Sequence, residues 1–237
     1  MNSKNVRIIC LVLALSLCTA LLGGCRGNSK HETVEPEETQ QVFDPAAYVK
    51  GGLDAVYLGE YSDEYLALLG GETAESCAER YERGMQVSLD VFCEYFGIEL
   101  EQCSESVRSS LLELMRKLYK CAKYEVGTPA QDGESYSVEV RVSPIAAIAQ
   151  VAKEDYPDFA KNSAESSARG ELDKSSASFS DWWAKSISDM VSARLISPEY
   201  LDAQSVTVTL EKNDGGSYAF SGTSLSDIDA LIVSYPA

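Results

Sequence analysis

Residues 136–142 read YSVEVRV, and the alternation of apolar and polar side chains in this stretch decides the class of fold. A period of two is typical of a β-strand that buries one face and exposes the other. The turn signal Asp132-Gly133 precedes the stretch, and residues 124–127 before the turn are also rich in strand-forming residues. The sequence therefore predicts a β-hairpin in this part of the chain.

A second hairpin is predicted near the C-terminus. Apolar residues alternate at Val206, Val208 and Leu210, the run 213–216 (NDGG) forms a turn, and residues 218–220 return along the first strand. Helical patterns precede each hairpin and a serine-initiated segment follows each one, which is a weak internal repeat. Duplication of one unit and independent use of the same turn residues both account for it.

Helices are predicted wherever apolar residues recur at three- and four-residue spacing. Asp44-Pro45 places an N-cap before a proline at the first helical position, and Thr73 is a further N-cap. The segments from Thr73 to Gly97 and from Ser104 to Ala122 are predicted to form an antiparallel helical hairpin. The other helices are expected over about residues 45–60, 63–69, 144–151, 179–197 and 224–232.

The combined pattern predicts an α+β fold. A helical hairpin and further helices would pack on an antiparallel sheet of about four strands formed by the two β-hairpins. A loop is expected within the serine-rich passage 163–180. Residues 44–237 are expected to form a single domain.

The N-terminus has the pattern of an export signal. Lys4 and Arg7 precede a largely apolar run at 8–22, and Gly23-Gly24-Cys25 follows, so residues 1–24 are predicted to be a signal peptide. Leu22-Gly23-Gly24-Cys25 resembles the bacterial lipobox, in which the cysteine is lipidated and becomes the first residue after cleavage. The resemblance implies a lipid anchor at Cys25 on the extracytoplasmic face of the membrane. An ordinary signal peptide that ends near a cysteine is the alternative.

The segment after the lipobox lacks apolar periodicity and is acidic. Residues 25–43 are therefore interpreted as the lipidated cysteine and a solvated tether. The whole chain of 237 residues has 37 acidic and 20 basic residues and a net charge of −17. This charge argues against nucleic acid as a partner, because phosphate binding needs clustered Lys and Arg.

The chemistry that the sequence offers is limited. The one histidine, His31, lies in the tether, which excludes Ser-His-Asp and Cys-His catalysis in the folded part. The sequence has no phosphate loop and no Gly-x-Gly-x-x-Gly, so no cofactor is expected. The acidic groups Asp227-x-Asp229 and Glu154-Asp155 with Asp158 lack the spacing of a calcium loop, and no metal site is expected.

Four cysteines follow the lipidation site. In a helical hairpin that turns near residue 99, Cys77 faces Cys121, and Cys93 meets Cys103 across the loop. Two disulfides are expected in an exported protein, with buried free thiols as the alternative.

Asp181-Trp182-Trp183 is the local feature with the character of a ligand contact. Consecutive helical residues diverge by about 100°, so both indoles cannot face the same core. Trp183 shares a stripe with Phe179, Ile187 and Met190, which predicts that Trp183 is buried and that Trp182 is the exposed indole. Exposed indoles stack on sugars or cap apolar ligands, so Trp182 is a candidate ligand contact.

The chain also resembles uncharacterised surface lipoproteins of Gram-positive bacteria. The resemblance rests on the lipobox and on FDPAAYVKGGLDAVYLGEY (43–61), ERYERGMQVSLDVFCEYFGIE (79–99), KCAKYEVG (120–127), YSVEVRVSPI (136–145) and SDIDALIVSY (226–235). It implies a surface-anchored domain and carries over no catalytic residues. The expected function is a non-enzymatic binding or interaction module of unknown ligand. A carboxylate-dependent hydrolase of cell-wall glycan and a transporter-associated binding subunit are the alternatives.

Overall fold

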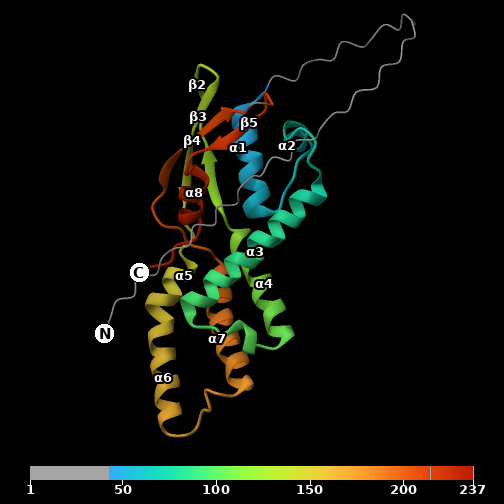
Figure 1. Ribbon diagram of the computed structural model, residues 1–237. Helices are drawn as coiled ribbons and strands as arrows, with labels where there is room; N and C mark the ends of the chain where they lie inside the picture. The colour runs from blue at the N-terminus through green and yellow to red at the C-terminus, as the bar shows by residue number, and fades with distance from the viewer. Residues whose placement is uncertain (1–42, 214, 237) are drawn as a thin grey trace, which may run out of the picture.

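The computed structural model describes residues 43–213 and 215–236, which form an antiparallel sheet with helices against it (Figure 1). The strands are β1 (Lys123–Val126), β2 (Ala130–Asp132), β3 (Ser135–Ser143), β4 (Gln204–Lys212) and β5 (Tyr218–Ser221). Their order is β1-β3-β4-β5, and β2 pairs with the first residues of β3. The predicted α+β class is confirmed. The short strand β2 makes the described sheet five-stranded instead of four-stranded.

The alternation of apolar and polar residues in YSVEVRV corresponds to a buried and an exposed face of β3. Val138, Val140 and Val142 are fully buried, whereas Glu139 and Arg141 point to solvent. Across the central pair of strands, Val138 faces Val208 and Val140 faces Val206. The sheet therefore has one dry face and one wet face, as antiparallel sheets commonly do.

The helices occupy most of the remaining chain. They are α1 (Pro45–Leu53) with the π-helical turn η1 (Asp54–Leu58), α2 (Asp63–Leu68), α3 (Ala74–Phe96), the 3₁₀ turn η2 (Leu100–Gln102), α4 (Glu105–Tyr119), α5 (Ala147–Gln150), the π-helical turn η3 (Val151–Asp155), α6 (Tyr156–Ala168), α7 (Ala177–Leu195) and α8 (Ser224–Ile232).

The predicted helix boundaries follow from their caps. The Asp44 carboxylate accepts hydrogen bonds from the amides of Ala46 and Ala47 at 2.9 and 3.1 Å. Thr73 forms a capping box with Ser76, and Gly97 ends α3 at a φ of +64°, a conformation that glycine adopts without strain. These three caps confirm the predicted starts of α1 and α3 and the end of α3.

Two predicted boundaries shift. The helix expected to begin at Pro144 begins at Ala147, because the backbone of Ile145 is engaged in bridges to Tyr200 and Val233. The serine-rich passage is mainly helical, since α6 extends to Ala168 and α7 begins at Ala177, and the expected loop is confined to residues 169–176.

The helices pack in two groups around a shared hydrophobic cluster. Helices α1 and α8 lie against the sheet, and α8 contacts β3, β4 and β5. Helices α3 and α4 run antiparallel as predicted, joined across the pair by an ion pair between Arg116 and Glu82 at 2.5 Å. Helix α7 packs on α4, and α6 and α7 lie at the end of the molecule away from the sheet (Figure 1). None of the helices within the described ranges has the length and apolarity needed to span a bilayer.

Candidate functional site

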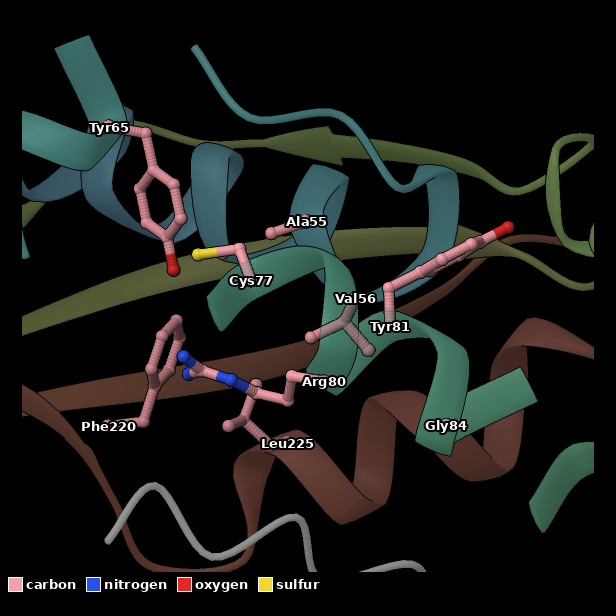
Figure 2. Close-up of a pocket in the computed structure, with 10 residues that line it drawn as sticks. Ala55, Val56, Tyr65, Cys77, Arg80, Tyr81, Gly84, Phe220 and Leu225 are labelled. Carbon is pink, nitrogen blue, oxygen red and sulfur yellow. The ribbon is translucent and has the colours of Figure 1, made fainter. Parts of the chain in front are cut away.

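A pocket lies where α1, η1, α2, α3, β5 and the start of α8 meet (Figure 2). Its volume is about 560 Å³, including the part open to solvent. Most of the lining atoms are apolar, and one guanidinium and one thiol are among them. The lining residues are Gly52, Ala55, Val56, Tyr65, Cys77, Arg80, Tyr81, Gly84, Phe220 and Leu225.

The glycine pair in α1 allows aromatic rings to form one wall of the pocket. A Cβ atom at Gly51 would overlap the Tyr65 ring, and a Cβ at Gly52 would lie 3.0 Å from Cζ of Phe220. Both rings therefore rest directly on the backbone of α1. The role of these glycines is close approach between α1, α2 and β5.

The opposite wall comes from the first half of α3. Cys77, Arg80, Tyr81 and Gly84 recur at spacings of three and four residues, so they share one face of the helix. Arg80 forms an ion pair with Glu72, which lies just before the start of α3. Figure 2 shows the Arg80 side chain extending toward Phe220, with the Cys77 sulfur and the Tyr65 hydroxyl near each other.

Burial determines the protonation states of Tyr65 and Cys77 in the pocket. Burial raises the pKa of Tyr65 well above its usual value, and the positive charge of Arg80 opposes this only in part. Burial also raises the pKa of the Cys77 thiol, so the thiol is neutral at pH 7 and a poor nucleophile. The ion pair of the site is the one between Arg80 and Glu72. Among the described lining residues none is a carboxylate, so the site lacks the paired acids that glycan hydrolysis needs.

The predicted lipid attachment site, Cys25, and residues 26–42 of the predicted tether lie outside the described residues. Phe43, which was assigned to the tether, belongs to the folded domain, because its ring stacks on Tyr218 with centroids 4.2 Å apart. The structure does describe the four later cysteines, and all of them are free thiols. The predicted disulfides Cys77–Cys121 and Cys93–Cys103 are therefore not formed.

The side chains explain why the first pair does not meet. Cys77 belongs to the pocket face of α3, with Sγ 3.7 Å from Glu72 Oε2. Cys121 lies beyond the end of α4, and its thiol points to the carbonyl of Lys117 at 3.4 Å. Cys93 and Cys103 are both buried in the hydrophobic cluster, where burial raises the pKa of Cys93 to about 12.

The two tryptophans are placed as predicted. Trp182 is 40% exposed, whereas Trp183 packs against the core and its Nε1 donates a hydrogen bond to the carbonyl of Phe96 at 3.0 Å. Trp182 also contacts Phe159 and Phe179, with ring centroids 5.2 and 5.7 Å away. Trp182 lies on α7, remote from the lining of the pocket, so Trp182 and the pocket do not form one site.

Three of the acidic residues considered for metal binding, Glu154, Asp155 and Asp229, have other partners. Glu154 and Asp155 form ion pairs with Arg194 at 3.0 and 2.7 Å. Asp229 turns inward from α8, where burial raises the pKa of its carboxyl to about 6 and a hydrogen bond from Tyr57 opposes the rise. Across the described ranges, His, Cys, Asp and Glu side chains do not gather in a group of three or more that could hold a metal ion.

Sequence reasoning missed the pocket and its arginine. The available signal was the α3 stripe itself, because Arg80 and Gly84 occupy positions where an amphipathic helix would place apolar core residues. The other wall carried a weaker signal, the glycine pair inside α1. No pattern in the sequence placed Phe220, which comes from the opposite end of the chain, against that helix.

Comparison with known proteins shows similarity to a solved structure. No protein-family model and no curated protein sequence matches the chain. The crystal structure of YcdA from Bacillus subtilis, described as a putative lipoprotein, matches with a TM-score of 0.56 and 12% sequence identity. The match covers 80% of this chain and 56% of YcdA, so the chain spans little more than half the length of that protein. At this identity the similarity establishes a shared fold.

Proposed function

We propose that the protein is a lipid-anchored extracytoplasmic binding module, and that the pocket between α1, α3 and β5 holds its ligand. The observation that supports binding is the pocket itself, a mostly apolar hollow with one positioned charged group, which is the usual composition of a small-molecule site. The lipobox at Leu22–Cys25 supports the anchor, and the lipoprotein description of YcdA supports the same location.

A non-enzymatic role fits the chemistry of the lining. The Cys77 thiol is held neutral by burial, and the arginine beside it cannot act as a general base at physiological pH. The groups present are suited to hold a molecule in place: aromatic and aliphatic walls, and a guanidinium at one side.

The experiment fills the pocket and measures binding of a neutral aromatic probe, 4-fluorobenzyl alcohol, by ¹⁹F NMR. Val56→Phe places a larger side chain in the lining and should abolish saturable binding. Val87→Phe is the matched control, because Val87 is a similarly half-buried valine on α3 that does not line the pocket. Equal binding by both variants and the unaltered protein would show that the pocket is not the binding site.

A further inference from the structure

We propose that the ligand of this pocket is a small apolar molecule with a single negative charge, and that its acidic group pairs with Arg80 in place of Glu72. The inference rests on the proposed function, since it names the chemical class of ligand for the same pocket. It is carried by the position of Arg80, the exposure of Glu72 and the apolar walls around them.

Arg80 lines the pocket and has N–H groups beyond the one that binds Glu72. A guanidinium has five N–H donors in a fixed plane that matches a carboxylate. Among the described residues Glu72 is the sole carboxylate in contact with Arg80, through one nitrogen atom, Nη2. The Arg80 side chain is only 21% exposed, because its stem lies along the pocket wall. The remaining donors are therefore available to an anion that enters the pocket.

Glu72 has the properties of a partner that can be displaced. Its side chain is 33% exposed, and it follows Gly70-Gly71, whose positive φ values of 65° and 125° place the residue in a turn outside α3. Solvent reaches the Glu72 carboxylate and screens its attraction to Arg80, so the carboxylate loses little when it rotates into water. A ligand anion would keep the charge of Arg80 compensated and would also bury its apolar part against Tyr65 and Phe220.

The same geometry sets the charge of the ligand. A cation would face Arg80 directly, and a neutral molecule would leave the Arg80–Glu72 pair in place and gain only apolar contacts. A second negative charge would find no second cation among the described lining residues and would be desolvated against aromatic rings. One acidic group on a compact apolar body is the combination that the lining accommodates.

The experiment compares 4-fluorobenzoate with 4-fluorobenzyl alcohol, which have the same ring and differ in charge, by ¹⁹F NMR titration of the full-length protein. The unaltered protein should bind benzoate more tightly than the alcohol. Arg80→Gln should weaken benzoate binding at least about tenfold, as expected for a lost hydrogen-bonded charge pair, and should weaken alcohol binding much less. Glu72→Gln should tighten benzoate binding by about two- to fivefold, because the competing carboxylate is removed.

Two further variants serve as controls. Arg83→Gln removes the same charge from α3 at a side chain that is 67% exposed and outside the lining, and it should change neither affinity. Arg80→Lys keeps the charge and a partner for Glu72 but loses the planar fork, so benzoate affinity should fall to an intermediate value. This second variant keeps the test informative if Arg80→Gln folds poorly.

Different results would separate the two proposals. Equal affinity for benzoate and the alcohol, or benzoate binding that Arg80→Gln and Arg80→Lys leave unchanged, would overturn the anion while the pocket remained a binding site. Benzoate binding that Glu72→Gln does not tighten would overturn the exchange of partners at Arg80. Probe binding that Val56→Phe does not reduce would instead overturn the proposed function.

Discussion

Replacing Asp229 by asparagine should stabilise the protein at neutral pH. The Asp229 carboxyl faces the core from α8. It interacts electrostatically with the hydroxyls of Tyr57, Tyr119 and Tyr235. Burial raises the pKa of this carboxyl from 3.8 to about 6, and the hydrogen bond from Tyr57 lowers it in part. The unfolded chain has no such burial, so its carboxyl ionises at the ordinary value.

The sign of the effect follows from proton binding in the two states. The folded protein holds the Asp229 proton to higher pH than the unfolded chain does, so the free energy of unfolding falls as the pH rises from about 4 to about 6. At 1.36 kcal/mol for each pH unit, the difference between 3.8 and about 6 corresponds to about 3 kcal/mol. Asparagine cannot ionise, and the Asp229→Asn variant avoids this loss.

Urea unfolding at a series of pH values between 4 and 7, followed by circular dichroism, measures the effect. The stability of Asp229→Asn relative to the unaltered protein should rise by about 3 kcal/mol over this range. Tyr57→Phe should lower the free energy of unfolding at pH 7, because it removes a hydrogen-bond donor to the Asp229 carboxylate. Asp189→Asn, an exposed substitution on α7, controls for the loss of one acidic charge. Parallel pH dependence of Asp229→Asn and the unaltered protein would refute the reasoning.

Three other predictions concern the anchor, the indoles and the glycine pair. Cys25→Ala should leave uncleaved precursor and abolish labelling with radioactive fatty acid, and persistent labelling would refute the lipobox. Trp183→Ala should cost about 3–5 kcal/mol in urea unfolding and Trp182→Phe much less, whereas acrylamide should quench a protein that retains only Trp182 more strongly than one that retains only Trp183. Gly51→Ala should lower stability by about 1–3 kcal/mol although alanine favours helices, because its Cβ would overlap the Tyr65 ring, and a higher thermal midpoint for this variant would contradict that packing.

The elements that sequence predicted well are those whose residues serve both local and global structure. The valines of β3 alternate because one face of the strand is buried, and Asp44 and Gly97 mark helix ends because they satisfy local backbone groups. Strand β2 was missed because all three of its residues are exposed and carry no apolar alternation. Its strand conformation depends on pairing with Ser135–Ser137.

The candidate site was less predictable for a related reason. Cys77 was expected to face Cys121, but Cys77 lines the pocket together with residues of α1 and α2. The ion pair that joins α3 to α4 lies further along α3, at Glu82. Helical periodicity gives the buried side of a helix but does not say which element covers each turn. The position of Arg80 beside Phe220 depends on that tertiary information.

The central ladder of the sheet has a consequence for how the chain folds. Strands β3 and β4 pair residues that are distant in sequence, such as Val140 with Val206, and α5, α6 and α7 lie between them. Strand β4 is synthesised only after those three helices, so the backbone edge of β3 that pairs with β4 stays unpaired until then. The sheet therefore closes late, and a chain truncated before residue 204 lacks the strand that completes it.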